Sequence, residues 1–354
     1  MMIGIQVARG ARVWTAALAA ALALQAPARA FDLVFTITDP GAYTANQLVL
    51  LTQGVARAEA MWETVITGYQ PGINVGSVPI SVNRTTGGLA SASFSGSTFQ
   101  GGFHVTTSGF VSFNINEIEN FANWQGDEPN GLNFIDEILA HEVGHVLGVG
   151  TQWVNNGQYV FGTFQYMGPN GLAAYRAEFD PAANFVPVEN AGNSGTPNAH
   201  WDQRMRSSTQ EGDPINPFAL DPRVGVTDQY GRDRGLELMT GAIDPDFLEP
   251  FLSRFTVESM RDLGYTVAAL EDFNSDGAVN GADLTILQTN MGATGLQIDS
   301  LRFGDANRDR RVDAEDLRLW HVAAGVPEPG TLVLAAIGFV ALGRKALRRR
   351  QFDI

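Results

Sequence analysis

Residues 141 to 150 read HEVGHVLGVG, and this stretch constrains the fold more than any other part of the sequence. On an α-helix, residues four apart lie on one face, so His141 and His145 can bind one metal ion while Glu142 lies beside them. Apolar residues gather on the opposite side of the same helix, which we expect to span residues 133 to 149. One face of this helix must therefore pack on a core while the other lines a cleft.

The histidine pair indicates a zinc site whose chemistry Glu142 would complete. Zinc lowers the pKa of a bound water to about 7, and an adjacent carboxylate can accept the proton and later pass it to a leaving amine. Catalytic zinc usually has three protein ligands, and Thr151 stands where a compact motif would carry the third. Of the five histidines, His104 lies in a strand-like region and His321 in C-terminal repeats, which leaves His200 as the third ligand.

The hydrophobic pattern around this helix indicates an α+β domain. Residues 31 to 37 alternate apolar and polar side chains, as in a strand with one buried face. Residues 45 to 66 have apolar side chains at helical spacing and indicate a long helix, and short strands are expected between residues 73 and 115. Residues 151 to 235 show no long periodic run and form either an insertion or an active-site wall. Residues 246 to 263 again indicate a helix.

Two similar acidic segments, the first loop (residues 272 to 283) and the second loop (residues 305 to 316), form an internal repeat. Oxygen-bearing side chains occupy positions 1, 3, 5, 9 and 12 of each loop, as in an EF-hand-like calcium site. Gly277 can make the sharp turn of the first loop, whereas Arg310 replaces it in the second and calls that site's affinity into question. The expected Ca²⁺ ligands are Asp272, Asn274, Asp276, Asn280, Asp283, Asp305, Asn307, Asp309, Asp313 and Asp316.

Composition narrows the class of protein. The 354 residues, 44% of them hydrophobic, suffice for an enzyme-sized domain and a smaller one. A formal charge of −15 argues against binding to a phosphate backbone, so we expect no nucleic-acid partner, whereas an excess of acid suits cations. The absence of cysteine excludes disulfides, thiolate metal sites and cysteine nucleophiles.

Both ends of the chain resemble targeting signals. Within residues 1 to 30, Arg9 and Arg12 precede an apolar run and a final Ala-Arg-Ala, which predicts a signal peptide. Residues 326 to 329 read VPEP, and an apolar segment and a basic cluster follow, an order that resembles the PEP-CTERM sorting signal of Gram-negative bacteria. The resemblance implies removal by an exosortase-type enzyme. The apolar helix would reach about 20 Å against a hydrocarbon core of about 30 Å, which suits transient membrane association. A plain membrane tail with positive-inside arginines is the alternative.

Several motifs in order resemble the leishmanolysin-type metalloproteases, a metzincin branch in which an insertion displaces the third histidine. They are HEVGHVLGVG, a long insertion, AHWD at residues 199 to 202, ELMTG at residues 237 to 241, and a stretch that resembles the closing helix at residues 255 to 265. The eukaryotic members are rich in cystine, and this chain departs from them in having no cysteine.

The leishmanolysin resemblance covers residues 31 to 268 and assigns roles within them. It implies zinc on His141, His145 and His200, and general acid and base chemistry by Glu142. It also implies that Met239 packs beneath the metal as the Met-turn, and by analogy that residues 109 to 115 form the edge strand that binds an extended peptide. A structural histidine beside Trp201 and an ordinary core methionine are the alternatives for His200 and Met239.

The two loops resemble a type I dockerin domain, because aspartate stands at position 12 and a hydrophobic helix follows each loop. The resemblance implies calcium binding and a cohesin-like partner. The positions that dockerins commonly use for cohesins hold Gly281-Ala282 and Ala314-Glu315 in place of hydroxyl pairs. The sequence therefore favours calcium binding over cohesin binding.

We therefore predict an α+β fold in which a metzincin-like zinc protease domain, with a mixed twisted sheet, a long helix, an active-site helix and a Met-turn, precedes a small α-helical dockerin-like domain. The expected segments are a signal peptide (1 to 30), a zinc peptidase (31 to 268), a dockerin-like domain (269 to 325) and a sorting signal (326 to 354). The predicted protein is an exported zinc endopeptidase of the Gram-negative envelope or medium that binds Zn²⁺ and Ca²⁺ and cleaves proteins or peptides. The alternatives are an inactive metzincin-fold adhesion protein and a calcium-dependent dockerin-type interaction protein.

Overall fold

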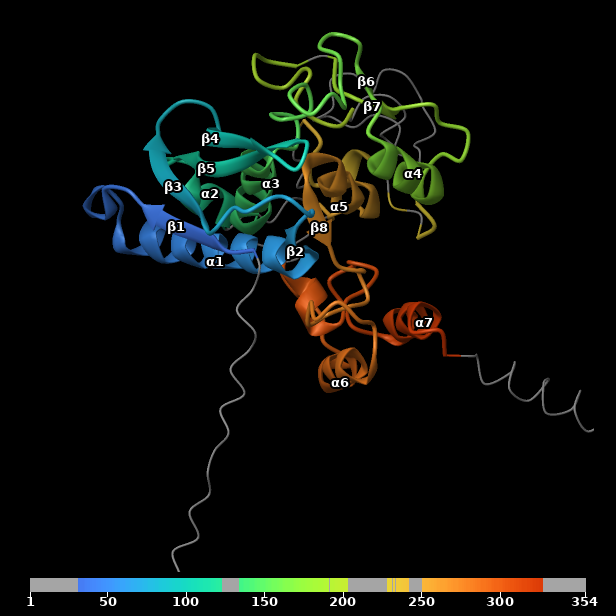
Figure 1. Cartoon of the computed structure of the whole chain (residues 1–354). Coiled ribbons are helices and arrows are strands. Elements are labelled where there is room, and N and C mark those ends of the chain that lie inside the picture. The colour runs from blue at the N-terminus through green and yellow to red at the C-terminus, as the bar shows by residue number, and fades with distance from the viewer. Residues whose placement is uncertain are drawn as a thin grey trace, which may run out of the picture.

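The computed structural model describes residues 31–122, 134–190, 192–202, 228–230, 232, 234–241 and 250–326. The expected signal peptide and the sorting segment from residue 327 onward lie outside the described residues. The described chain forms a larger α+β unit followed by a small helical unit (Figure 1). The α+β class and the small helical C-terminal unit are confirmed. In these described ranges, no helix combines the length and the apolar character needed to cross a membrane.

A four-stranded mixed sheet forms one layer of the larger unit. Its order is β1 (Leu33–Ile37), β3 (Val78–Thr85), β5 (Phe103–Asn114), β4 (Ala90–Gln100). The first three strands run parallel, and β4 pairs antiparallel with β5. The turn between β4 and β5 contains Gly101 and Gly102 at φ +59° and +92°, a conformation that glycine adopts without strain.

This topology corrects two expectations from the sequence. The segment at residues 109 to 115 is not an edge strand, because it belongs to β5 and lies between β3 and β4. The edge strand next to it is β4, which the Gly-Gly turn folds back along the outer side of β5. The strands are also longer than expected: β4 has 11 residues and β5 has 12.

Two helices cover the sheet and meet each other. The long helix α1 (Ala45–Val65) begins with a capping box between Thr44 and Gln47. The second, α3 (Ile135–Leu147), packs on α1, β4 and β5. The two helices approach closely at Gly54, where a Cβ atom would lie 2.7 Å from Leu139 Cδ1. A hydrogen bond of 2.8 Å from Trp62 Nε1 to the carbonyl oxygen of Ala140 fixes their register.

The region after α3 is more ordered than its composition predicts. The segment from 151 to 235, expected to be an insertion or an active-site wall, contains α4 (Pro169–Glu178), which begins with proline at its first turn. The helix expected at residues 246 to 263 is α5 (Arg254–Ser259) continued by η3 (Met260–Leu263). The remaining short elements of this unit are η1 (Pro40–Ala42), β2 (Ile66–Tyr69), α2 (Ile118–Ala122), β6 (Gln165–Tyr166), β7 (Val186–Pro187), η2 (Arg234–Leu236) and β8 (Tyr265–Val267).

The C-terminal unit has a small core of its own. It consists of α6 (Gly281–Asn290), η4 (Ser300–Phe303) and α7 (Ala314–Ala323). The core contains Phe273, Leu287, Ala306, Val312 and Trp320. α6 follows the first acidic loop and α7 follows the second, so the internal repeat of the sequence is also a structural repeat.

Candidate metal centre and calcium loops

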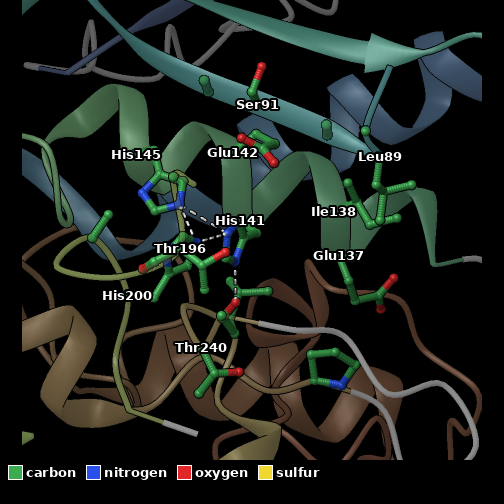
Figure 2. A pocket seen from close by; sticks show the side chains of 18 of the residues that line it. Leu89, Ser91, Glu137, Ile138, His141, Glu142, His145, Thr196, His200 and Thr240 are labelled. Carbon is green, nitrogen blue, oxygen red and sulfur yellow. Dashed lines mark hydrogen bonds between the residues drawn. The ribbon is translucent and has the colours of Figure 1, made fainter. Parts of the chain in front are cut away.

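Three histidines from distant parts of the chain converge on one point. His141 and His145 extend from α3, and His200 enters from the segment before Trp201 (Figure 2). Their Nε2 atoms form a nearly equilateral triangle with sides of 3.1, 3.0 and 3.0 Å. Among the described residues, this is the one group of three or more His, Asp or Glu side chains whose ligand atoms lie within 4.8 Å of one another.

The other ring nitrogen of each histidine fixes its tautomer. Nδ1 lies 2.6 Å from the carbonyl oxygen of Leu238 in His141, 2.8 Å from that of Val149 in His145 and 2.9 Å from that of Thr196 in His200. A carbonyl oxygen only accepts hydrogen bonds, so each Nδ1 carries the proton and each Nε2 presents a lone pair. Three lone pairs facing one another about 3 Å apart repel, and a cation bound by all three removes the repulsion. The donor set therefore fits zinc, which prefers neutral imidazole nitrogen.

Burial keeps the three histidines neutral. It lowers the pKa of His141, and it lowers the pKa of His200 to about 3 with a further contribution from nearby His141. Burial also holds the pKa of His145 well below its usual range, and the two neighbouring histidines act in the same direction. Metal ligation requires unprotonated imidazole, so the cavity favours the state that binds an ion.

The approach of two loops brings His200 to α3. Gly150 has a φ of +77°, and a Cβ atom there would lie 2.0 Å from the carbonyl oxygen of Ala199. Only glycine permits this contact, and the contact places the residue after Ala199 beside His145. Thr151, at the position where the sequence suggested a missing ligand, instead donates a hydrogen bond of 2.6 Å to the carbonyl oxygen of His145. The same carbonyl also accepts the N–H group of Gly148 (3.2 Å), so Thr151 adds a second hydrogen bond at the end of α3.

Glu142 lies in the same cavity as the histidines (Figure 2). Its side chain is 6% exposed, and its Oε2 atom has no hydrogen-bond partner among the described residues. Burial raises the pKa of this carboxyl to about 8. A carboxylate that gains a proton this readily is suited to accept one from a bound molecule.

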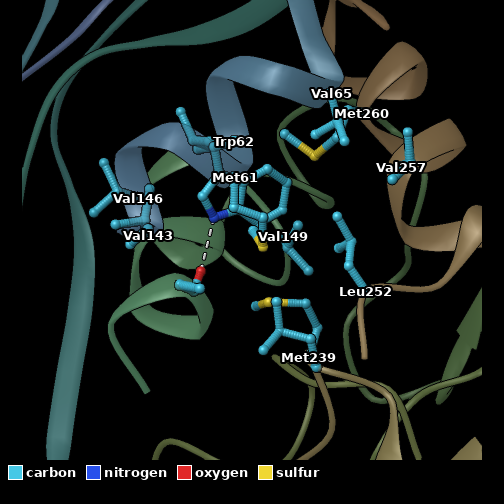
Figure 3. Packing of buried hydrophobic residues seen from close by; sticks show 14 of the residues in the cluster. Met61, Trp62, Val65, Val143, Val146, Val149, Met239, Leu252, Val257 and Met260 are labelled. Carbon is cyan, nitrogen blue, oxygen red and sulfur yellow. Dashed lines mark hydrogen bonds between the residues drawn. The ribbon is translucent and has the colours of Figure 1, made fainter. Parts of the chain in front are cut away.

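Met239 lies beneath α3. It is fully buried, and its Sδ atom would be 2.5 Å from a Cβ atom at Gly144, between the two histidines of the helix. Trp62 packs at the same place, 3.0 Å from that Cβ position, and Figure 3 shows both side chains in this part of the core. Gly144 therefore allows the segment around Met239 to support the helix directly below the triad.

The sequence did not reveal the role of Glu237, two residues before Met239. Glu237 is 1% exposed, and its carboxylate accepts hydrogen bonds from the backbone N–H groups of Met239 (2.6 Å) and Ser253 (3.2 Å), the Ser253 hydroxyl (2.7 Å) and the Thr256 hydroxyl. Thr256 in turn accepts a hydrogen bond of 2.8 Å from Trp201 Nε1. The network connects the Met239 turn, α5 and the residue after His200. An acid beside an apolar turn is the only signal in the sequence.

A cavity of about 510 Å³ contains the triad and Glu142. Residues of β4 and of the turn before it form one wall, and Glu137, Ile138, Leu236, Leu238 and Pro250 contribute to the rest. In Figure 2, Ser91 lies on β4, which runs above α3, and Leu89 lies in the turn just before this strand. β4 is an edge strand of the described sheet. The backbone N–H and C=O groups on its outer side therefore have no strand partner within this sheet, and they lie on the side of the cavity.

The two acidic loops have the same backbone conformation. In the first loop, Asp272 accepts hydrogen bonds from the N–H groups of Asp276 (3.2 Å) and Gly277 (2.9 Å). In the second loop, Asp305 accepts from Asp309 (3.0 Å) and Arg310 (2.9 Å). Arg310 has a φ of +66° and Gly277 a φ of +90°. The arginine that replaces glycine therefore keeps the turn.

The remaining expected calcium ligands follow the same repeat. Asn280 and Asp313 cap α6 and α7, and Asp283 and Asp316 complete capping boxes. Asn274 and Asn307 donate from Nδ2 to Asp276 (3.0 Å) and Asp309 (3.1 Å). These hydrogen bonds orient the carboxylate groups of Asp276, Asp283, Asp309 and Asp316 within the loops.

Buried acids favour ion binding in both loops. Asp283, Asp305 and Asp316 are fully buried and Asp272 is 2% exposed. Burial raises the pKa of Asp272 and Asp305, and it raises the pKa of Asp316 to about 7. Oxygen ligands at these positions fit a hard divalent cation, which would relieve the cost of burying the charged acids.

Comparison with known proteins identifies two segments of the chain. Residues 270–321 match the dockerin type I domain, and residues 325–350 match the PEP-CTERM protein-sorting motif. Dockerin domains bind calcium, and the sorting motif implies export and sorting to the cell envelope in Gram-negative bacteria. No curated protein matches the chain. These matches cover the C-terminal part, and they define an exported, surface-sorted protein with a calcium-dependent module.

Proposed function

We propose that this exported protein is a zinc endopeptidase related to the leishmanolysin-type metzincins. The observation that carries the proposal is the triangle of three Nε2 lone pairs beside the buried carboxylate of Glu142. His141, His145 and His200 would hold the ion. The mixed sheet, the helix α3 with its histidines, and Met239 beneath them support a metzincin-like fold for the larger unit.

The residues of the cavity suggest how hydrolysis would proceed. When bound, zinc supplies Lewis acidity toward water and toward the scissile carbonyl group. Glu142 accepts the proton of the attacking water and delivers it to the nitrogen of the leaving amine, which is why an unpaired, buried carboxylate with a raised pKa suits this position. The carbonyl oxygens of Leu238, Val149 and Thr196 hold the imidazole rings in the binding tautomer throughout.

The wall formed by β4 suggests an extended peptide as the substrate. The free edge of β4 can pair with a peptide backbone, which adds a strand to the sheet and places a peptide bond across the cavity. Backbone pairing is largely independent of side chains. The proposal therefore predicts cleavage of unfolded proteins and flexible peptides.

The decisive experiment measures zinc content and hydrolysis of an unfolded protein by the purified chain. We expect zinc bound in a one-to-one ratio, and we expect Glu142→Ala to retain zinc while losing about 10²- to 10⁴-fold in activity. His200→Ala should lose the ion, whereas His104→Ala, a histidine on β5 outside the triad, should keep it. Tight zinc binding without any cleavage by the wild-type chain would refute the peptidase.

The second candidate is a calcium-dependent interaction protein, and the match to the dockerin type I domain favours it. In that case a cohesin-like partner would bind the C-terminal unit, and an exosortase-type enzyme would process the sorting segment. Gly281 and Ala282 are exposed on α6, so a partner has access to this helix. Calcium-dependent capture of the chain by an immobilised cohesin, with no proteolysis in the assay above, would support this candidate.

A further inference from the structure

The second loop inserts two arginine side chains into the larger unit. Arg308 and Arg310 are 7% and 5% exposed, and both have positive φ angles, +62° and +66°. Arg308 donates a hydrogen bond of 2.9 Å to the carbonyl oxygen of Leu252 and lies 3.5 Å from Glu178. Non-glycine residues adopt this backbone region at a cost. The first loop has the same conformation at Ser275 (φ +58°) and Gly277 (φ +90°), so the backbone geometry belongs to the loop type, and the contacts of the two arginines are specific to the second loop.

Arg310 reaches the wall of the candidate active site. Its Nη2 atom lies 3.0 Å from Glu137 Oε1 and 3.0 Å from the carbonyl oxygen of Pro250. Glu137 and Pro250 both line the cavity that contains the triad. Glu137 is also on α3, one helical turn before His141. A single side chain thus connects the second loop to two parts of the cavity wall.

The larger unit also binds the backbone of the second loop. Arg232 donates hydrogen bonds from Nη1 to the carbonyl oxygens of Asn307 (2.6 Å) and Arg308 (3.1 Å), and Asp228 binds the same guanidinium at 2.8 Å. Asn307 is an expected calcium ligand, and the N–H group of Arg310 donates to Asp305, the ligand at position 1. The residues that would hold calcium and the residues that make the contact are therefore interleaved along the loop.

The first loop has no arginine at the positions of Arg308 and Arg310, and its contacts with the larger unit differ accordingly. Ser275 and Gly277 occupy the positions of Arg308 and Arg310, and a Cβ atom at Gly277 would have no neighbour within 4 Å. Its contact with the larger unit is a hydrogen bond of 2.6 Å from Ser275 Oγ to the carbonyl oxygen of Thr64 at the end of α1. Neither Ser275 nor Thr64 lines the cavity.

We propose that the second loop is a calcium-dependent docking surface for this chain's own larger unit, and that Arg310 couples calcium occupancy to the wall of the cavity. Calcium would fix the loop backbone through Asp305 and so hold Arg310 against Glu137 and Pro250. Without calcium, the loop has no ion to organise its buried acids, and the two contacts loosen. The docking itself does not depend on the peptidase, but its effect on a bound zinc ion rests on the proposed function.

Hydrogen–deuterium exchange of the purified full chain tests the docking without any substrate. On calcium addition, we expect exchange in peptides covering residues 134 to 141 and 250 to 254 to slow by about tenfold. Arg310→Gly, which restores the glycine of the first loop, should still bind calcium by calorimetry but should lose this slowing. Arg318→Ala removes an exposed arginine of the same unit and should behave as the wild type. Glu137→Gln gives an independent variant, which should reduce the slowing.

Zinc transfer to a chromophoric chelator that does not bind calcium tests the consequence for the triad. We expect calcium to slow zinc release about fivefold or more in the wild type and to have no effect in Arg310→Gly. Full calcium-dependent protection of both peptides in Arg310→Gly would overturn the proposal, as would calcium binding at the second loop with no change in the wild type. Absence of zinc binding would refute the proposed peptidase and leave the exchange result to decide the docking.

Discussion

The histidine triad and the calcium loops gather their ligands in opposite ways. The expected oxygen ligands of each loop come from twelve consecutive residues, and backbone N–H groups of the same loop already hold Asp272 and Asp305 in position. The triad takes ligands from residues 141 to 200, and a carbonyl group at Leu238 fixes one of the rings. A local site tolerates changes in its surroundings, whereas a site made of distant segments depends on each close approach that brings them together.

Among the variants that test this difference, Gly150→Ala should cause the largest loss of stability and of zinc affinity. A Cβ atom at Gly150 would lie 2.0 Å from the carbonyl oxygen of Ala199, so the segment of His200 must move. We expect a destabilisation of about 4 kcal/mol and at least about 100-fold weaker zinc binding. Gly157→Ala is the matched control, because Gly157 also has a positive φ, +68°, but has open space around it. Urea unfolding and zinc competition measure both, and equal effects of the two variants would contradict the close approach.

Glu237→Gln should alter the dependence of stability on pH in the metal-free chain. Burial raises the pKa of Glu237 to about 7, whereas the unfolded chain titrates near 4.5, so the folded state holds more protons between these values. Its contribution is complete below about pH 4.5 and is lost as the pH rises through about 7, a change of about 3 kcal/mol. We expect the glutamine variant to lack this loss. Unfolding curves at several pH values check it, and parallel curves for both proteins would contradict it.

Gly144→Ala tests the support beneath the triad. The added methyl group would lie 2.5 Å from Met239 Sδ and 3.0 Å from Trp62, so the turn below α3 must shift. Overpacking of this kind costs about 1 to 3 kcal/mol. We expect that loss in urea unfolding together with weaker zinc binding. Loss of stability with unchanged zinc affinity would show that Met239 supports only the core.

Gly277→Arg should have the smallest effect, because it places in the first loop the residue that the second loop carries. The position is open, so the change costs only the left-handed backbone conformation, about 1 kcal/mol. Calcium binding to the first loop, measured by calorimetry, should weaken by no more than about tenfold. Complete loss of that binding would show that arginine at this position is incompatible with a calcium loop, and the second loop would then be unable to bind the ion.

The sequence predicted features made of neighbouring residues better than features made of distant segments. The loops, the long helix and the helical phase of His141 and His145 depend on residues close together in the chain, and these were predicted. His200 could be proposed only because the chain has few histidines, and its position depends on the contact between Gly150 and Ala199. The edge position of β4 and the helix α4 were not predicted, because strand order depends on non-local pairing and α4 is a short helix that contains a glycine and shows little amphipathic character. The contacts of Arg310 gave no signal beyond a missing glycine.

The carbonyl partners of the three imidazoles determine when the triad can exist at all. Leu238, Val149 and Thr196 belong to different segments, and the folded larger unit brings them to the triad. Small metal-binding domains use the ion to drive their folding. Here a large hydrophobic core surrounds the donor set, so an ion would bind to imidazoles that the folded chain already holds in place. The ion would then report that a newly exported chain has matured, and it would contribute little to the maturation itself.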